Sequence, residues 1–387
     1  MRILQVHSRY RAAGGEDAVV HAEGELLAGA GHEVVSYMTD NPTDRLATAA
    51  SLAMSTWNPY AASTLRAVAR KVQPDVAHVH NTWFALTPSV IAALDAAGVP
   101  VVVTLHNYRL LCVNAALFRD GRPCEDCVGI LPWPGVRHRC YRGSAVASAA
   151  AAASIAANRA LGTWHHRVRL FLALNEFARD QFIRGGLPAH KLRVKPNFVP
   201  DPGPRRRPPS SSRVVLYVGR VAPEKGVSVL LQAWRELGST TLQLVIIGDG
   251  PLRQALERQA PSAVSFQGWL PPEQVRQWMS RSRALLFPSI AYEGQPIVVL
   301  EALAAGLPVL GSRLGGNPEL LQAQGPQWLA TPNDPAAWTR ALRALDDADS
   351  VNEAGKRARK LYEERFNEHR GRRLLEDAYQ MATGRRR

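Results

Sequence analysis

Two glutamates stand eight positions apart in an otherwise apolar segment, SIAYEGQPIVVLEALAAGLP at residues 289–308. A buried carboxylate without a partner is costly, so Glu293 and Glu301 each need a hydrogen-bond donor or a cation. Pro296 suits the first turn of a helix, which puts Glu293 in the preceding loop and Glu301 inside the helix. Glu301 can then accept hydrogen bonds from a ribose diol. The backbone around the turn can bind a phosphate or a sugar, and that turn comprises Gly294, Gln295, Pro296 and Ile297.

Glu301 has a simpler alternative, an ion pair with a neighbouring arginine on a solvated helix face. The four residues from Ile297 to Leu300 that precede it are apolar, which makes a solvated face less favourable. The spacing therefore favours a ligand as the partner of this carboxylate.

A second segment that carries chemistry is LYVGRVAPEKG at residues 216–226. A strand pattern ends at Gly219, Arg220 and Lys225 follow, and Gly226 precedes a helix that begins near Val227. A guanidinium fork, a mobile ammonium and a helix N-terminus together suit a pyrophosphate, although an ordinary surface turn has the same residue types. The GxGP turn within VIIGDGPLRQALE, residues 245–257, is weaker support of the same kind.

The elements that must position these residues are short apolar runs separated by helical patterns. In the first half the runs are nearly continuous rather than alternating, as in parallel strands buried on both faces; they cover 2–7, 32–38, 75–80, 100–106 and 168–174. Helical patterns lie between several of them, at 16–30, 60–72 and 88–97. This alternation predicts a doubly wound α/β sheet.

A second α/β domain follows a linker. PDPGPRRRPPSSS at residues 200–212 has no hydrophobic periodicity and is typical of an interdomain connection. Strand runs then resume at 213–219, 242–248, 284–288 and 307–312, and polar helical patterns fill 351–365 and 368–383. Ligands bind beyond the carboxyl ends of the strands of such sheets, so two of these domains would enclose a cleft.

Composition limits the kind of protein. The 387 residues are 46% hydrophobic and 21% charged, as expected for a globular protein with large cores. The Ala-rich run at 144–164 is interrupted by polar residues and suits a helix better than a membrane span. No signal-peptide pattern precedes the first strand, so the cytoplasm is the expected compartment, where structural disulfides are rare.

The chain is strongly basic, with a formal net charge of +14. Between Arg137 and Lys195, eleven Arg and Lys residues face only Glu176 and Asp180. Such a balance suits an anionic partner: a phosphorylated substrate, an acidic membrane surface or nucleic acid. A solvated basic face is the equally weighted alternative.

In order and spacing these motifs resemble those of the retaining glycosyltransferases of family 4. The resemblance rests on EGQPIVVLE downstream of GRVAPEKG and covers nearly the whole chain. Four further segments match: RAAGGEDAVVHAEGELLAGAGHEV (11–34), VTLHNY (103–108), VKPNFV (194–199) and GLPVLGSRLGGNPELL (306–321). It implies the GT-B fold, in which two Rossmann-like domains face each other across a cleft. The implied division is an N-terminal domain at 1–199, a linker at 200–212, a donor domain at 213–365, and a C-terminal helix at 366–387 returning to the first domain.

The resemblance also implies a role for each matching residue. Arg220 and Lys225 would bind the donor diphosphate, Glu301 the ribose hydroxyls, and Glu293 would lie near the donor sugar without acting as a nucleophile. His106 would face the transferring sugar, while Gly14 and Gly15 would let the first loop approach the donor. The family often has an aromatic residue where this chain has Gln295, which leaves the donor sugar open. No metal is needed at the reaction centre, and a UDP- or GDP-sugar is the expected donor.

All four cysteines of the chain fall within the irregular segment 107–143, at Cys112, Cys124, Cys127 and Cys140. A CxxC pair with two flanking cysteines is compatible with a tetrahedral structural zinc site, which would order a loop with few core residues. Four reduced thiols, or an opportunistic disulfide, are the alternative. In a GT-B enzyme this segment would lie where the acceptor binds.

The prediction is thus a retaining glycosyltransferase acting on a glycan or lipid-linked acceptor, with electrostatic docking on an anionic membrane. A nucleotide-sugar epimerase would use the same nucleotide cleft without an acceptor, but the match of both glutamates and of Arg220 and Lys225 disfavours this alternative. A third hypothesis, that the chain is a nucleic-acid-binding protein, has little support, because aromatic residues do not interleave with the basic runs.

Overall fold

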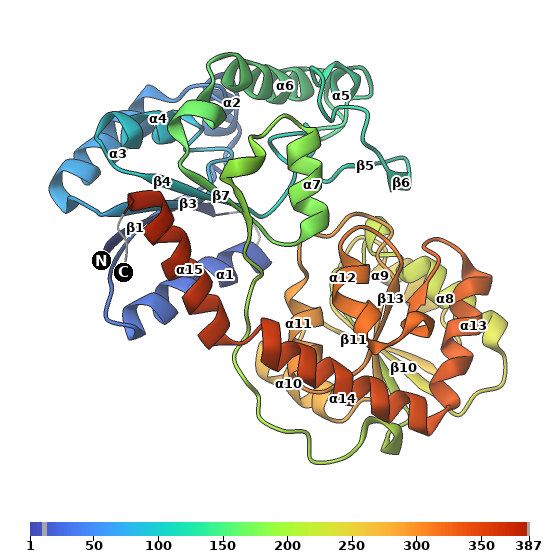
Figure 1. Ribbon diagram of the computed structural model, residues 1–387. Helices are drawn as coiled ribbons and strands as arrows, with labels where there is room; N and C mark the ends of the chain where they lie inside the picture. The colour runs from blue at the N-terminus through green and yellow to red at the C-terminus, as the bar shows by residue number, and fades with distance from the viewer. Residues whose placement is uncertain (10–13, 385–387) are drawn as a thin grey trace. The chain divides into compact units, whose positions relative to one another are not determined.

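The computed structural model describes residues 1–9 and 14–384, which form two compact units (Figure 1). The first unit comprises Met1–Leu117, Cys124–Asn197 and Gly371–Arg387. The second comprises Phe118–Pro123 and Phe198–Arg370. Each unit has its own parallel sheet of six strands.

The sheet of the first unit has the strand order β2-β1-β3-β4-β7-β8, and every pair is parallel. Its strands are β1 (Arg2–Arg9), β2 (Glu33–Asp40), β3 (Val76–Asn81), β4 (Val101–Leu105), β7 (Leu170–Ala173) and β8 (Leu192–Val194). The inner strands β3, β4 and β7 are buried at every residue, which confirms the prediction from their continuous apolar runs.

The helices of this unit are α1 (Gly15–Gly29), α2 (Arg45–Ala53), α3 (Pro59–Val72), α4 (Ser89–Ala96), α5 (Trp133–Arg137), α6 (Ala145–Ala160), α7 (Glu176–Arg184) and most of α15 (Glu368–Thr383). Their starts are set by local sequence. The side chains of Asn58, Ser144 and Asn175 each accept a hydrogen bond from a backbone N–H in the first helical turn. The Ala-rich run accordingly forms the helix α6.

The helix α15, drawn in dark red in Figure 1, supplies part of the core of the first unit. Its Leu375, Ala378 and Tyr379 are buried and cluster with residues of the sheet, among them Ile3 and Leu172. The last helix of the described chain thus completes a hydrophobic layer on the sheet of the first unit, whose strands come from the first half of the sequence.

The sheet of the second unit has the order β11-β10-β9-β12-β13-β14, again all parallel. Its strands are β9 (Val214–Val218), β10 (Gln243–Ile247), β11 (Val264–Gly268), β12 (Ala284–Phe287), β13 (Val309–Ser312) and β14 (Leu329–Ala330). This is the strand order of dinucleotide-binding folds. The direction of winding reverses between β9 and β12, where such sheets bind their ligands.

Two layers of helices cover this sheet: α8 (Val227–Leu237), α9 (Arg253–Arg258), α10 (Pro272–Ser280), α11 (Ile297–Ala304), α12 (Asn317–Leu321), α13 (Pro335–Arg343) and α14 (Ala348–Arg365). Alternate strand residues point to opposite faces. Leu216 and Leu285 pack with α10, α11 and α14, whereas Val215 and Leu286 pack with α8 and α13.

Several elements differ from the sequence prediction. The strands β8, β11 and β14 were not predicted; β8 and β14 are only three and two residues long, too short for a periodicity signal. An antiparallel hairpin of two short strands, β5 (Phe118–Arg119) and β6 (Arg122–Pro123), lies within the cysteine-containing segment. Pro296 precedes the first turn of α11 as its N-cap rather than lying within it.

Within residues 1–9 and 14–384, none of the helices combines the length and the apolar character that a membrane-spanning segment requires.

Candidate active site

The loops that follow β9 and β12 meet at the topological switch point of the second unit. Nζ of Lys225 lies 2.7 Å from Oε1 of Glu293, and the hydroxyl of Ser289 donates a hydrogen bond to the same oxygen at 2.6 Å. The structure therefore brings together one cation and one carboxylate that the sequence predicted from separate motifs.

Backbone contacts hold these two loops against each other. The N–H of Ile290 donates to the carbonyl of Glu224 at 3.0 Å. Gly226, at φ +69°, approaches so closely that a Cβ atom there would lie 1.9 Å from the carbonyl oxygen of Pro288. Only glycine fits this position, for reasons of both backbone conformation and space. Gly226 also ends the turn Pro223–Lys225 and leads directly into α8, which fixes where Lys225 leaves the backbone.

Arg220 lies on the exposed side of the same loop. Its side chain is 64% exposed and pairs with Glu224. The hydroxyl of Tyr217 donates to the carbonyl of Arg220 at 2.8 Å, and burial, with a further contribution from the charge of Glu293, raises the pKa of that hydroxyl. A ligand that binds the guanidinium would have to break only its ion pair with Glu224, and an exposed ion pair contributes little to stability.

A second glycine turn backs this loop. Gly248, at φ +135°, follows β10, and a Cβ atom there would lie 1.9 Å from the carbonyl oxygen of Gly219. The VIIGDG motif that the sequence marked as weak evidence therefore closes against the end of β9. It supports the geometry of the candidate site through its backbone.

Glu301 occupies a different environment from Lys225 and Glu293. It lies in the second turn of α11 and lines a pocket of about 930 Å³, together with residues 199–207 and the end of α10. Burial raises its pKa, and the charge of Arg276 opposes that shift. No residue of the described chain hydrogen-bonds to its carboxylate or forms an ion pair with it within 4.0 Å. Neither Lys225 nor Glu293 lines this pocket.

The turn between Glu293 and Glu301 contains the other predicted donor-binding residues. Gln295 is 7% exposed, and Gly294 and Pro296 lie on either side of it. The carbonyl of Pro296 accepts a hydrogen bond from the N–H of Val299 at 3.1 Å, which begins α11 at Ile297. The N-terminal end of this helix is therefore at the switch point, as the sequence predicted for a phosphate or sugar site.

The first unit has its own cluster at the carboxyl ends of β1, β3 and β4. His106 directly follows β4, and its Nε2 lies 3.1 Å from Nδ1 of His80. Burial, with smaller contributions from the charges of Lys195 and His7, lowers the pKa of His106 to about 3. The ring is therefore neutral at physiological pH and can act as a hydrogen-bond donor or acceptor but not as a cation.

The predicted glycine-rich loop lies next to this cluster. Gly14 is the N-cap of α1 and its N–H donates to Oδ2 of Asp17 at 3.0 Å; Gly15 is the first helical residue. The side chain of Asn107, which follows His106, donates to Oε1 of Glu16 at 2.9 Å. Residues 11–13 of the predicted loop lie outside the described residues.

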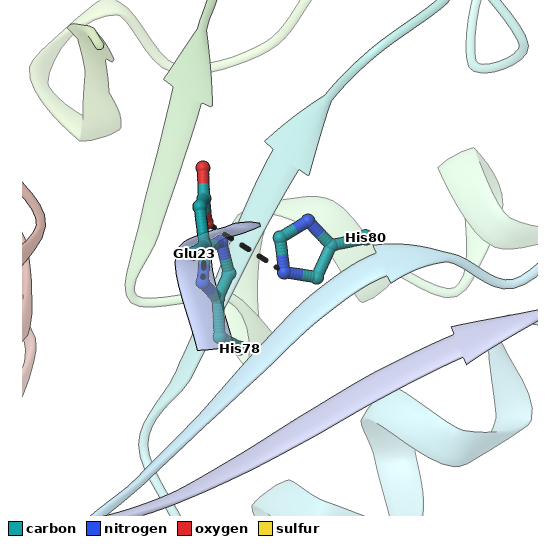
Figure 2. Close-up of side chains that lie close together, drawn as sticks. All are labelled: Glu23, His78 and His80. Atoms are coloured by element: carbon teal, nitrogen blue, oxygen red, sulfur yellow. Dashed lines mark ion pairs between the residues drawn. The ribbon is translucent and has the colours of Figure 1, made fainter. Parts of the chain in front are cut away.

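Four buried residues near His106 were not predicted: Glu23, His78, His80 and Lys195. Figure 2 shows Glu23 close to both histidines, its Oε2 lying 3.7 Å from Nδ1 of His78 and 3.9 Å from Nε2 of His80. The sequence DVAHVH carried a signal, since alternating histidines in a strand lie on one face. Lys195 and Glu23 are 172 positions apart, and no local pattern connects them.

Glu23, His78 and His80 form a group with the ligand atoms and spacing of a metal site, the one such group within residues 1–9 and 14–384. Their other contacts argue against a metal ion. Lys195 places an ammonium on Oε1 of Glu23. Both ring nitrogens of His78 are occupied, one by the hydroxyl of Tyr379 at 2.8 Å and the other by that of Thr104 at 2.7 Å. A buried cation is already present where a metal would bind.

The four cysteines lie in the first unit and none is in a disulfide. Cys112 and Cys127 are buried, and Sγ of Cys112 donates to Oδ1 of Asn114 at 2.9 Å. Burial raises the pKa of the Cys127 thiol to about 11; a backbone hydrogen bond from Gly135 opposes this, and the charges of the other three thiols add to it. The other three thiols thus lie close enough to Cys127 to affect its pKa, but the cysteines do not form a group with the spacing of a metal site within the described chain.

The chain has two units, each with a parallel sheet. One of them has the strand order of a dinucleotide-binding fold and a Lys–Glu pair at its switch point. This combination defines a protein of the GT-B glycosyltransferase class. Residues 13–201 match the family described as Glycosyltransferase Family 4, and residues 212–347 match that described as Glycosyl transferases group 1. The chain belongs to this family, and both the predicted family and the predicted fold class are confirmed.

Individual relatives agree with this assignment. The chain is 26% identical over 329 residues to the 2-deoxystreptamine glucosyltransferase of Streptomyces kanamyceticus, covering 82% of this chain and 80% of the relative. It is 29% identical over 219 residues to WcaL of Escherichia coli, named for colanic acid biosynthesis, covering 51% of this chain. That match spans about half the length of WcaL, 53%.

Among solved structures, Anabaena HepE in complex with UDP and glucose superposes with a TM-score of 0.67 at 16% identity. The superposition covers 97% of this chain and 99% of the HepE chain. At this identity the likeness establishes the fold, and the chemistry of the chain must be argued from its own residues.

Proposed function

We propose that the protein is a retaining glycosyltransferase that moves a sugar from a nucleoside-diphosphate-sugar to a glycan or lipid-linked acceptor. The observation that carries the proposal is the contact between Lys225 and Glu293 at the switch point of the second unit. The ammonium of Lys225 and the exposed guanidinium of Arg220 belong to the loop after β9, and the start of α11 follows the loop after β12; this combination supports a diphosphate site.

The proposed chemistry is electrostatic. As the bond between the sugar and the diphosphate breaks, negative charge develops on the leaving phosphate, and Arg220 and Lys225 stabilise it. Glu293 positions Lys225 and contacts the donor sugar, and its place in an ion pair suits it poorly as a nucleophile. Glu301, which lacks a partner among the described residues, accepts hydrogen bonds from the ribose. We propose no metal at this reaction centre.

The donor is proposed to be a UDP- or GDP-sugar. HepE, a protein of the same fold, was crystallised with UDP and glucose, which supports UDP as the first candidate. Gln295 is the residue that distinguishes this chain from the family pattern, and its buried side chain is the first candidate for reading the sugar hydroxyls.

Thermal stabilisation of the protein by UDP, GDP, ADP, CMP and their sugar conjugates tests the donor site. We expect one diphosphate series to raise the melting temperature, and Arg220→Ala and Glu301→Ala to reduce that rise. Arg357→Ala and Glu353→Ala, which alter an exposed pair on α14, are the matched controls and should leave it unchanged. Absence of stabilisation by every nucleotide contradicts the proposal.

Turnover separates a transferase from its closest alternative. An epimerase using the same nucleotide cleft would convert the donor sugar with no acceptor present, whereas the proposed enzyme requires an acceptor or, more slowly, water. Product analysis with the donor alone distinguishes the two. Binding to oligonucleotides at physiological salt tests the weaker nucleic-acid reading.

We further propose that the acceptor is presented at the inner face of an anionic membrane, to which the first unit docks. Ile130, Leu131 and Trp133 are 54%, 67% and 69% exposed, and the exposed Arg137 and Arg139 come four and six positions after Trp133. Apolar side chains beside arginines suit the interface of an anionic bilayer.

Flotation with phosphatidylglycerol vesicles tests the docking. Binding should weaken with salt and with Trp133→Ser. Trp269→Ser, a change at a 71% exposed tryptophan of the second unit, is the matched control. Equal recovery with neutral and anionic vesicles contradicts this part of the proposal.

The cysteine cluster is proposed to hold a structural zinc ion through Cys112, Cys124, Cys127 and Cys140. Four thiols from three stretches of chain suit a tetrahedral site, and the segment between them has only a two-residue hairpin and one short helix of its own. The ion would order this segment and take no part in the transfer reaction.

A further inference from the structure

Three buried side chains of the first unit form a continuous series that ends at the half-buried His106. Lys195 is bonded to Oε1 of Glu23, and the two side chains are 1% and 0% exposed. The second oxygen of Glu23, Oε2, lies 3.9 Å from Nε2 of His80, and each of these atoms lacks a hydrogen-bond partner within the described chain. On the other side of its ring, Nδ1 of His80 lies 3.1 Å from Nε2 of His106.

The charge at one end of this series determines where the protons are. A carboxylate paired with an ammonium can only accept hydrogen bonds, so its negative charge, 3.9 Å away, favours hydrogen on the ring nitrogen of His80 that faces it. Burial, with the charges of neighbouring cations, lowers the pKa of His80 well below its usual value. A neutral imidazole has one N–H, so a proton on Nε2 of His80 makes its Nδ1 an acceptor.

The same argument then applies to His106. Because Nδ1 of His80 accepts, Nε2 of His106 must donate across the 3.1 Å contact, and its own Nδ1 has no proton. The opposite arrangement would place the lone pairs of Glu23 and His80 against each other in a buried site, where such repulsion is strongly unfavourable.

We infer that Glu23, acting through His80, fixes His106 in the tautomer protonated on Nε2, so that Nδ1 is a hydrogen-bond acceptor for a hydroxyl of a bound sugar. No side chain or backbone group of the described residues hydrogen-bonds to Nδ1 of His106. His80 and His106 also line a small pocket of about 50 Å³, large enough for a single hydroxyl or water. The role toward a sugar rests on the proposed function, whereas the tautomer does not.

Within the series His80 and Glu23 are positioning residues. His78 is not part of it, because its two nitrogens are bonded to Tyr379 and Thr104. Tyr379→Phe therefore removes one hydrogen bond from the same buried cluster without touching the contacts between Glu23, His80 and His106. It is the matched control for any effect of general destabilisation.

The test is NMR of the full chain labelled with ¹⁵N at histidine, in which ring nitrogen shifts report the tautomer. The His106 signals are assigned by their loss in His106→Gln. In the wild type we expect a single form with Nε2 protonated. In Glu23→Leu combined with Lys195→Met, which removes both charges together, we expect a mixture of tautomers at His106. Replacing a buried ion pair by apolar residues of similar volume is often neutral for stability, so this variant is expected to fold.

Two variants at position 80 keep the inference falsifiable if the double variant does not fold. His80→Asn retains an acceptor near the place of Nδ1 and should preserve the tautomer, whereas His80→Phe should not. Tyr379→Phe should leave it as in the wild type. Wild-type His106 protonated on Nδ1, or an unchanged single tautomer in the double variant, overturns the inference.

Kinetics link the tautomer to the sugar. Once a donor is identified, the double variant and His80→Phe should lower kcat/KM about tenfold, the scale of one hydrogen bond, and His80→Asn should restore most of the loss. Tyr379→Phe should have little effect. A wild-type protein that binds and turns over no sugar donor would contradict the proposed function while the NMR result still decides the tautomer. Unchanged kcat/KM in variants with an altered tautomer overturns the sugar-binding role.

Discussion

Nζ of Lys225 lies 2.7 Å from Oε1 of Glu293, and the two side chains are 25% and 15% exposed. The carboxylate therefore orients the ammonium at the switch point. Under the proposed function, a diphosphate bound there would compete with Glu293 for the same cation. The pair thus orients Lys225 in advance and reduces the side-chain entropy lost on binding.

Lys225→Met should weaken binding of the donor nucleoside diphosphate by about 10- to 100-fold, because a charge-assisted hydrogen bond contributes roughly 1.5–3 kcal/mol. Isothermal titration calorimetry with the nucleotide that stabilises the wild type measures the change. Lys360→Met, at an exposed lysine of α14, should bind as the wild type does. Equal affinity of Lys225→Met and the wild type would place the phosphates elsewhere.

Gly226→Ala should destabilise the second unit and abolish donor binding. Its Cβ atom would lie 1.9 Å from the carbonyl oxygen of Pro288, so the loops after β9 and β12 must separate. We expect a loss of at least about 3 kcal/mol in the free energy of unfolding, measured by urea denaturation.

Gly306→Ala is the matched control for this change. Gly306 has a similar backbone conformation, φ +60°, but the nearest atoms to its Cβ position are 3.7 Å away. It should cost only the strain of the left-handed conformation, about 1–2 kcal/mol. Similar losses in the two variants would show that the close approach of the loops is unimportant.

Stability should fall as the pH is lowered below about 6.5, because the fold holds four histidines of the first unit as neutral rings. Burial lowers the pKa of His7, His78, His80 and His106, so below 6.5 the unfolded chain binds more protons than the folded chain. The contribution of these rings to stability is fully present above the pKa of histidine in the unfolded chain. It is lost as the pH falls toward the lower pKa values of the rings in the folded chain. His106, whose pKa is lowered to about 3, alone contributes about 2 kcal/mol between pH 7.5 and pH 5.

Urea midpoints at pH 7.5 and pH 5, at constant ionic strength, measure this dependence. His80→Asn removes one of the four rings and should make the difference between the two midpoints smaller. Equal midpoints for the wild type at the two pH values would mean that these rings are protonated in the folded state.

Purified protein should contain about one zinc ion per chain by elemental analysis, and Cys127→Ser should lose it together with several degrees of melting temperature. The Glu23→Leu and Lys195→Met variant alters the other group of metal-ligand type and should keep its zinc. Zinc-free wild-type protein prepared without chelators, or zinc lost only in the latter variant, would refute the cysteine site.

The sequence predicted the second unit well because its chemistry is local. Gly219, Lys225, Glu293 and the start of α11 each lie within ten residues of a strand end, so position in the chain determined position in space. The pocket of Glu301 was less predictable, because residues 199–207 and the end of α10 line it from distant parts of the sequence.

The buried cluster of the first unit could not be predicted for the same reason. Glu23 lies on a helix whose amphipathic pattern gives no sign that a carboxylate faces the sheet, and Lys195 follows a three-residue strand. Only the alternation of His78 and His80 was visible. The partner of a buried charge is set by the folded structure. It cannot be found from a short stretch of sequence when the two residues are far apart in the chain.

The contact between Tyr379 and His78 has a consequence for the order in which the protein can be made. Nδ1 of His78 lies 2.8 Å from the hydroxyl of Tyr379, and Leu375 and Ala378 belong to the same core. A ribosome synthesises the entire second unit before it reaches α15. Until then the nascent first unit has an uncovered apolar layer, and His78 lacks one of its two hydrogen-bond partners, so its folding can finish only after translation of the second unit is complete.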